Sequence, residues 1–528
     1  MRFGKLFSCF FAFLLFLVGF PEVARADGEK FVILPFKNVK DVRAMEFLSA
    51  ALPAEISRRF ENFEPFHPAL SEKIFPEQFD FEQPLPPADA VALATAYGAK
   101  YVLTGEFYGP NWKARFIINL YEIKDGTATV RTVEREVAVD GKEIREFPVL
   151  DEMLGALLGA YNLLPDEATW RRVTARPIKD HYAYVFLGRG IAAWRGVNRE
   201  QNLDAAEDYL KTATRTEPNF AFAHRIMALT LRDAGDDRAA VMRLEEAAGL
   251  DPKDYVSRMA LSGIYAANGD TAKALEVAKE AAAARPFEDE GLYQVGELAL
   301  KLGYRDIAES ALARATALNP RHVRARHLLA KIYAANGDGK KLIAELEVIV
   351  ILTPKDTDTA FALAAAYRRF GDSSRAVETL KSIIARDRRR TAAYKFLGDI
   401  YRTAGDNDNA IAVYSIGSRL APNDPRFAFA IGDAYFAKKN FALAQSYYRK
   451  ALRNGKTVRY AENNIAVSVA ALGDRVAARA MLESLSNRIP NYFLARYNLA
   501  AIYVAMGESK MAIGILRELY SIEPESQE

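Results

Sequence analysis

Residue types that carry enzyme or metal chemistry are sparse in this sequence. His322 and His327 are five residues apart, which places them poorly on one helical face for sharing a metal ion. The segment Gly188–Gly190 has no third glycine after it, so it lacks the spacing of a phosphate-binding loop. The acidic run Glu288–Glu290 is typical of a solvated face. No Ser/His/Asp arrangement stands out, so we expect no catalytic residue, no cofactor, no metal and no enzyme activity.

The composition leads to the same exclusions. The 528 residues include one Cys, which rules out a disulfide framework and a Cys-based zinc site. Lys plus Arg number 71 and Asp plus Glu number 68, giving a formal net charge of +3. A nearly neutral chain of this length gives no reason to expect a nucleic-acid partner. The length predicts several domains or a repeat array.

Residues 1–26 have the three parts of a secretory signal peptide. Arg2 and Lys5 form a short positive region, an apolar run follows from Leu6 to Phe20, and the tripeptide 24–26 reads Ala-Arg-Ala. A retained anchor is the alternative, but the run is short for a membrane span. We therefore expect cleavage after residue 26, a periplasmic protein and no transmembrane segment after cleavage.

Residues 27–162 predict a small α/β domain, because strand-like and helix-like patterns alternate. The expected strands are 31–36, 101–104, 114–123 and 127–139, and the expected helices are 45–60, 88–97 and 144–161. Asp125-Gly126 between two of these strands is a strong hairpin signal, and Gly105 is interpreted as a bulge. The Pro-rich residues 74–88 predict a loop.

This stretch resembles the amino-terminal domain of the Tol translocation protein TolB. The resemblance rests on VILPF at 32–36, AYGAKYVLTGEF at 96–107 and INLYEIKDG at 118–126. No propeller repeats follow, and the Pro-rich segment departs from the family pattern. The resemblance implies contacts between proteins of the cell envelope and no chemistry.

The rest of the chain repeats every 34 residues. The glycines of this register are Gly235, Gly269, Gly303, Gly337, Gly371, Gly405, Gly473 and Gly507, with Lys439 in the missing place. The matching alanines include Ala206, Ala240, Ala274, Ala410 and Ala444, and the matching tyrosines include Tyr265, Tyr333, Tyr367 and Tyr503. Each glycine is expected to end a first helix with a positive φ. Each alanine allows the second helix to cross the first closely, and each tyrosine fills the space between neighbours.

This pattern resembles the tetratricopeptide repeat (TPR) family. The resemblance implies about ten repeats over 181–528, after a linker or short helix at 163–180, and Trp194–Gln201 looks like an insertion in the first repeat. The fold class is therefore α+β overall, a small α/β domain followed by an all-α superhelical solenoid.

The resemblance also implies a binding groove lined by fixed positions of each first helix. The residues at these positions are Arg225, Arg232, His327, Lys331, Phe361, Arg368, Lys395, Arg402, Phe436, Asn463 and Tyr497. Cations with interspersed aromatic rings suit an acidic or extended segment of another protein, and Asn463 and Asn464 suit a peptide backbone. The alternative is an ordinary solvated face. The family's carboxylate-clamp pattern is incomplete in every adjacent pair of repeats.

The last expected helix, 509–522, is apolar on the side where a further repeat would pack. Met511, Ile515 and Leu519 are the residues predicted to form an association face, covered by a partner or by a second copy. The prediction as a whole is a non-enzymatic periplasmic scaffold that assembles or positions an envelope complex, such as secretion, pilus, flagellar or cell-wall machinery. The alternative is a module that binds an envelope polysaccharide or its synthase.

Overall fold

The computed structural model describes residues 29–39, 46–61, 66–68, 85–97, 99–109, 113–138, 146–175, 178–196, 200–453 and 458–522. The predicted signal peptide and most of the Pro-rich segment lie outside these ranges. The chain divides into two compact units, 1–325 and 326–528, which are described separately below. No helix in the described ranges is both long enough and apolar enough to cross a membrane.

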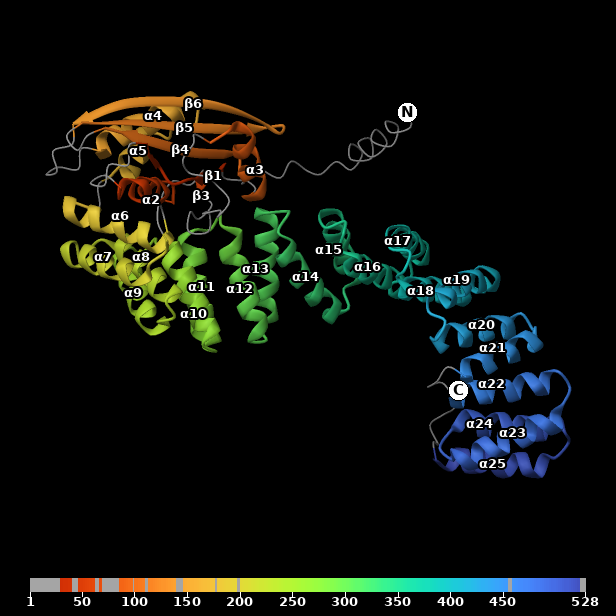
Figure 1. Ribbon diagram of the computed structural model, residues 1–528. Helices are drawn as coiled ribbons and strands as arrows, with labels where there is room; N and C mark the ends of the chain where they lie inside the picture. Colours follow the sequence, from red (N-terminus) through yellow and green to blue (C-terminus); the bar gives the residue numbers. More distant parts are fainter. Residues whose placement is uncertain are drawn as a thin grey trace, which may run out of the picture. The chain divides into compact units, whose positions relative to one another are not determined.

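The first unit begins with a mixed sheet, drawn in red and orange in Figure 1. Its strands are β1 (Glu29–Ile33), β2 (Lys37–Asn38), β3 (Phe66–Pro68), β4 (Tyr101–Tyr108), β5 (Lys113–Lys124) and β6 (Thr127–Ala138). The order is β3-β1-β4-β5-β6, with β2 also paired to β4. β1 runs parallel to β3 and β4, whereas β4, β5 and β6 are antiparallel. The four strands expected from the sequence are present as β1, β4, β5 and β6, and the structure adds the short strands β2 and β3.

The hairpin between β5 and β6 has the predicted turn. Lys124 pairs with Thr127, and the two residues between them have positive φ values, 51° at Asp125 and 75° at Gly126. Two left-handed residues form the primed turn whose twist matches that of a β-ribbon.

Gly105 does not form the predicted bulge. The β4–β5 register continues without interruption through the pair Gly105–Ile118. A Cβ atom at Gly105 would instead lie 2.3 Å from the ring of Phe36. The glycine is required because a buried ring crosses directly over the strand.

Helices cover both faces of this sheet. Their bounds are α2 (Leu48–Glu61), α3 (Pro87–Tyr97), α4 (Glu146–Ala160) and α5 (Glu167–Val173). Leu93 on α3 packs against Val32 and Val102 on one face. On the other face the ring of Phe31 stacks on Tyr101 at 4.7 Å and meets Phe60 of α2 at 5.0 Å. Successive residues of β1 point to opposite faces, so one short strand contributes to both cores.

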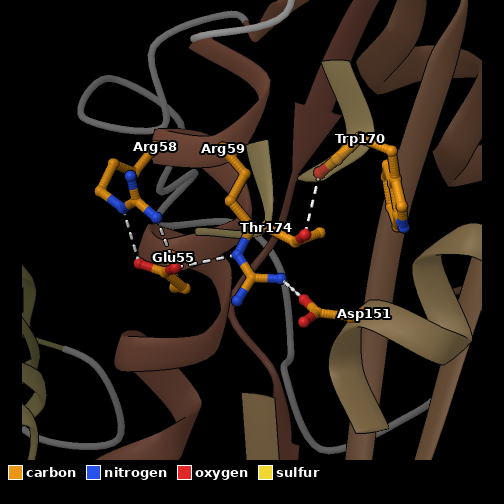
Figure 2. A network of polar contacts seen from close by, with 6 residues as sticks. All are labelled: Glu55, Arg58, Arg59, Asp151, Trp170 and Thr174. Carbon is orange, nitrogen blue, oxygen red and sulfur yellow. Dashed lines mark hydrogen bonds and ion pairs between the residues drawn. The ribbon is translucent and has the colours of Figure 1, made fainter. Parts of the chain in front are cut away.

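A buried ionic network joins α2 to α4 (Figure 2). The Arg59 side chain is almost fully buried and donates to Glu55 at 2.8 Å and to Asp151 of α4. Arg58 forms two further hydrogen bonds with Glu55, at 2.7 and 2.8 Å. Burial alone raises the pKa of Glu55, but the charges and hydrogen bonds of the two arginines lower it below its ordinary value. A buried arginine needs such partners, because an unpaired buried charge costs several kcal/mol, about 3–5 when one partner is removed.

The helices α6 to α25 form ten consecutive pairs. Those of the first unit are α6 (His181–Arg195), α7 (Leu203–Thr216), α8 (Ala221–Asp233), α9 (Asp237–Leu250), α10 (Tyr255–Ala267), α11 (Thr271–Ala284), α12 (Asp289–Lys301) and α13 (Arg305–Leu318). The later ones are α14 (Val323–Asn336), α15 (Gly339–Leu352), α16 (Thr357–Arg369), α17 (Ser373–Arg386), α18 (Thr391–Thr403), α19 (Asn407–Leu420), α20 (Pro425–Ala437), α21 (Phe441–Arg453), α22 (Val458–Ala471), α23 (Arg475–Arg488), α24 (Phe493–Ala505) and α25 (Ser509–Ile522).

The repeated residues have the predicted physical roles. All eight glycines of the register have positive φ, between 74° and 105°, and Lys439 adopts a φ of 60° in the same place. An Asp next to the glycine then caps the second helix, as Asp236 does by accepting from the Ala239 N–H at 3.0 Å. The alanines Ala206, Ala240 and Ala274 are completely buried. The fold class predicted from the sequence is confirmed.

The α/β domain docks on the first helix of the first pair. A Cβ atom at Gly188 of α6 would lie 2.7 Å from the Phe47 backbone oxygen and 2.8 Å from the Ala51 Cβ. The ring of Phe47 meets Tyr184 edge-on at 5.9 Å. The Gly188–Gly190 segment therefore serves close packing between helices, and α2 and α6 lie side by side (Figure 1).

Candidate partner-binding surface

The predicted groove residues all lie on first helices of the pairs. Arg225 and Arg232 are on α8, His327 and Lys331 on α14, Phe361 and Arg368 on α16, Lys395 and Arg402 on α18, Phe436 on α20, Asn463 on α22 and Tyr497 on α24. Their exposure differs: Arg232, His327, Lys331, Arg368, Arg402 and Tyr497 are exposed, whereas Arg225 and Asn463 are buried. Arg225 and Asn463 each make contacts that the sequence pattern did not predict.

Arg225 differs most from the expected exposed cation. Its guanidinium donates to Asp254 at 2.8 Å, and both side chains are less than 5% exposed. Asp254 also caps α10 by accepting from the Ser257 N–H at 3.1 Å. Arg225 therefore ties the second pair of helices to the third.

In the second unit, two consecutive repeats contain the same contact, in which a tyrosine of the second helix hydrogen-bonds to an aspartate of the first helix. Tyr414 of α19 donates to Asp399 of α18 at 2.7 Å, and Tyr448 of α21 donates to Asp433 of α20 at 2.8 Å. The ring of each tyrosine passes over the glycine that directly precedes the aspartate in the sequence. A Cβ atom at Gly398 would lie 2.3 Å from the Tyr414 ring. At Gly432 the distance to the Tyr448 ring would be 2.6 Å.

The two carboxylates differ in their electrostatic surroundings. Lys395 binds both oxygens of Asp399, at 2.7 and 2.8 Å. At Asp433, by contrast, burial raises the pKa although the hydrogen bond from Tyr448 and the charges of Arg402 and Lys395 oppose the shift. Burial and the nearby carboxylates raise the pKa values of Tyr414 and Tyr448, so both hydroxyls remain donors. Tyr448 therefore remains a hydrogen-bond donor to the partly buried Asp433.

From Asp433 a line of amides continues across the next two first helices, and we call it the amide ladder. It consists of Asp433, Asn464, Asn463 and Asn498. Asn464 donates to Asp433 at 3.4 Å, and Asn463 donates to Asn464 at 3.0 Å. Asn498 of α24 donates to Asn463 at 2.9 Å. Asn463 is 1% exposed and holds the other two asparagines, which are partly exposed. A peptide backbone needs such donors and acceptors at fixed spacing.

Before the ladder lies a group of rings and cations, which we call the Phe–Arg cluster. The rings of Phe361 on α16 and Phe396 on α18 are 5.3 Å apart. Arg368 lies 5.3 Å from the Phe396 ring, and Arg390 lies 5.7 Å from the Phe361 ring. Arg390 also forms an ion pair with Asp358. The cluster offers apolar area bordered by positive charge.

The other predicted aromatic residues are placed differently. Phe436 is partly buried, with its ring edge-on to Phe441 at 5.2 Å. Tyr497 is 60% exposed. Phe361 and Phe436 thus contact neighbouring rings, and Tyr497 is the exposed one of the three predicted groove aromatics.

The sequence pattern missed Asp433, Asn498 and Phe396 as candidates for this surface. The signal for two of them was present, because Asp433 follows Asp399 by 34 residues and Asn498 follows Asn464 by 34 residues. Tyr414 and Tyr448 share that spacing. A search of the 34-residue register for polar residues, beyond the Gly, Ala and Tyr positions, would have found the ladder.

The final helix exposes an apolar face that differs in part from the predicted one. Met511, Ile513, Leu516 and Tyr520 are exposed. Ile515 packs against the core of its own repeat, and Leu519 is partly buried. Met511 is therefore the predicted association residue that lies fully on the surface.

The fold and this surface define a helical-repeat binding protein. Models of the tetratricopeptide repeat match residues 227–289, 293–357, 361–425 and 425–454. The TPR repeat-containing protein YpiA of Bacillus subtilis is 28% identical over 197 residues, which are 37% of this chain and 45% of that relative. The chain therefore contains TPR repeats, a fold that implies protein–protein interaction and is typically non-enzymatic.

Solved structures of other repeat proteins are similar over part of the chain. The MamA protein is 26% identical and covers 31% of this chain and 91% of its own, with a TM-score of 0.29. YrrB, described as a TPR protein with an unusual peptide-binding site, is 18% identical and covers 35% and 95%, with a TM-score of 0.31. The C-terminal part of a TPR protein from Cytophaga hutchinsonii is 17% identical and covers 45% and 97%, with a TM-score of 0.38.

Proposed function

We propose that this protein is a secreted periplasmic scaffold that assembles or positions an envelope complex by gripping an extended, partly acidic segment of a partner. The single observation that carries the proposal is the amide ladder. It presents partly exposed asparagines in a line across consecutive first helices, held in place by the buried Asn463 and by the contact of the buried Tyr448 with the partly buried Asp433.

The Phe–Arg cluster supports the same mode of binding. An extended segment lying across α16, α18, α20, α22 and α24 would meet apolar and positive groups first and the amides next. Rings bordered by arginines suit a hydrophobic residue flanked by acidic ones, and asparagines suit the peptide bonds that follow. The exposed Arg402 lies between the two parts of the surface.

The cellular setting of the proposal rests on the amino-terminal sequence. The signal-peptide pattern at 1–26 and the TolB-like stretch support export and a role among envelope proteins. The machines that fit such a scaffold are those of secretion and of pilus, flagellar or cell-wall assembly. The exposed apolar face of α25 supports self-association or docking of a second protein.

Site-specific photo-crosslinking in the native cell tests the binding mode. The crosslinker is placed at Arg402 and Tyr497 on the surface, at Met511 on α25, and at the exposed Lys381 on the second helix α17 as the matched control. A protein partner captured from Arg402 and Tyr497 but not from Lys381 is the expected result. Equal capture from all positions, or capture of polysaccharide alone, contradicts the proposal.

Cell fractionation tests the location separately. The mature chain is expected in the periplasmic fraction, with its new amino terminus at residue 27. A full-length protein retained in the membrane or the cytoplasm would exclude the proposed export while leaving the binding surface untouched.

A further inference from the structure

A second candidate site lies within the first unit, where the α/β domain meets the repeats. It is a cavity of about 190 Å³ within the first unit. Arg58 of α2 forms one wall. The start of α8, the segment between α9 and α10, and Arg285 after α11 form the rest.

Positive side chains dominate the described lining. The described lining contains four basic residues, Arg58, Arg225, Lys253 and Arg285, and two acidic ones, Asp251 and Asp254. Arg58 and Arg285 also pair with carboxylates outside the lining, Glu55 at 2.7 Å and Glu288 at 3.7 Å. Asp254 is engaged with the buried Arg225 at 2.8 Å. Lys253 is exposed at the rim, where an incoming ligand can reach it.

The start of α8 adds to this positive character. The helix is 13 residues long, and its N-cap residue Phe220 forms no side-chain cap hydrogen bond. Phe220, Ala221 and Phe222 all line the cavity. The first N–H groups of a helix carry partial positive charge, and they attract an anion at this end.

The shape and polarity of the lining restrict the kind of anion. The rings of Phe220 and Phe222 give an apolar wall, and the Arg225 guanidinium lies 4.8 Å from the Phe222 ring. The carboxylates of Asp251 and Asp254 are in the same lining and repel a doubly charged group more strongly than a singly charged one. A carboxylate on a short aliphatic stem fits this combination better than a phosphate does.

We propose that this cavity binds an acidic side chain of a partner protein, as a second anchor at the junction of the α/β domain and the repeats. The proposal rests on the function proposed above, that of a protein scaffold. A side chain bound in this cavity would contact both domains at once. Arg58 belongs to the α/β domain, and Arg225, Lys253 and Arg285 belong to the repeats.

Peptide binding by the purified full chain tests this assignment. The ligand is a short peptide with two Glu residues, labelled with a neutral dye, and the same peptide with Gln is its uncharged control. Binding is followed by fluorescence anisotropy at low and at physiological salt. The Glu peptide is expected to bind, the Gln peptide to bind at least about tenfold more weakly, and salt to weaken the Glu complex.

Variants locate the binding on the protein. Arg58→Gln with Lys253→Gln is expected to weaken the Glu peptide about tenfold. Lys279→Gln with Lys381→Gln removes the same charge from exposed positions of α11 and α17 and is expected to leave binding unchanged. Circular dichroism and a thermal melt show that both double variants remain folded, and Glu55 keeps Arg59 as a partner in the first.

Three outcomes overturn the assignment. Equal binding of the Glu and Gln peptides excludes a carboxylate site. Competition by inorganic phosphate at a lower concentration than by acetate assigns the cavity to phosphate and not to a protein side chain. Loss of Glu-peptide binding in Arg402→Gln but not in the Arg58 and Lys253 variant moves the site to the repeat surface, which leaves the proposed scaffold function intact.

Discussion

Tyr448 donates a hydrogen bond to Asp433 at 2.8 Å by passing over Gly432, whose missing Cβ leaves room for the ring. This contact holds a partly buried carboxylate at one end of the amide ladder. The same arrangement, one repeat earlier, joins Tyr414 to Asp399 over Gly398. The packing of the repeat and the polarity of the proposed binding surface therefore depend on the same glycines.

Substitution of those glycines tests this dependence. Gly398→Ala or Gly432→Ala places a methyl group within 2.6 Å of a tyrosine ring and is expected to destabilise the second unit by about 1–3 kcal/mol. Gly263→Ala is the control, because nothing lies within 4 Å of its Cβ position and it sits inside helix α10. The control is expected to stabilise its helix by about 0.5–1 kcal/mol. Urea unfolding measures both, and equal destabilisation by all three variants contradicts the packing argument.

Asp433→Asn tests the electrostatics of the ladder. Burial raises the pKa of Asp433, so its ionised form is less stable in the fold than in the unfolded chain. The associated stability is present below the ordinary aspartate pKa, near 4, and is lost as the pH rises through the raised value. The asparagine side chain in the variant still has an oxygen that accepts hydrogen bonds from Tyr448 and Asn464, and it carries no charge.

The variant is therefore expected to be more stable than the wild type at pH 7 and no more stable at pH 3.5. Hydrogen exchange of α20 and α21 at the two pH values measures the difference locally. A variant that is less stable at pH 7 would show that the charge of Asp433 is stabilised by its neighbours after all.

Lys439 is the position where the glycine series of the repeat is interrupted. It holds a φ of 60° between α20 and α21, a conformation that costs a residue with a Cβ about 1–2 kcal/mol. Lys439→Gly is expected to stabilise the protein by about 1 kcal/mol, and Gly405→Ala at the equivalent site to destabilise it by a similar amount. Thermal melts of the two variants should shift in opposite directions. A shift in the same direction would exclude backbone strain as the cause.

The buried pair of Arg225 and Asp254 makes the first unit sensitive to acid. Burial raises the pKa of Asp254, but the Arg225 charge and the hydrogen bonds from Ser257 outweigh it and lower the pKa below the ordinary value. The stability that Asp254 contributes is complete above about pH 4 and is lost as the pH falls through the lowered pKa. Arg225→Ala leaves Asp254 buried without this partner and is expected to cost about 3–5 kcal/mol at pH 7.

In acid the loss should be smaller, because protonated Asp254 no longer needs the cation. Arg232→Ala on the same helix is the control, since its side chain is exposed. Unfolding at pH 7 and pH 3 measures the effect, and a pH-independent loss would assign the role of Arg225 to packing alone.

Much of the fold could be predicted from the residues because its constraints are local. A positive φ after each first helix favours Gly, a close helix crossing favours Ala, and a two-residue hairpin turn favours Asp125-Gly126. These requirements act over a few bonds, so the 34-residue spacing predicted the helix pairs and the residues 114–139 predicted the hairpin. The placement of the candidate groove residues on first helices followed from the same register.

The burial and the contacts of those side chains could not be predicted in the same way. Arg225 and Arg232 lie seven residues apart on α8, yet one is buried in an ion pair and the other is exposed. Gly105 was expected to form a bulge, but the ring of Phe36, distant in sequence, explains it. In each case the deciding neighbour comes from a different element.

The sequence by itself determined the repeat, the helix pairs and the hairpin, because backbone conformation and helix crossing depend on residue type at fixed spacing. Only the tertiary structure decided which side chains meet: Asn463 with Asn498, Tyr448 with Asp433, and Arg58 with the cavity beside α8. These contacts depend on how helices pack within and between repeats and on how the α/β domain packs against the repeats, and burial there sets charge and hydrogen bonding.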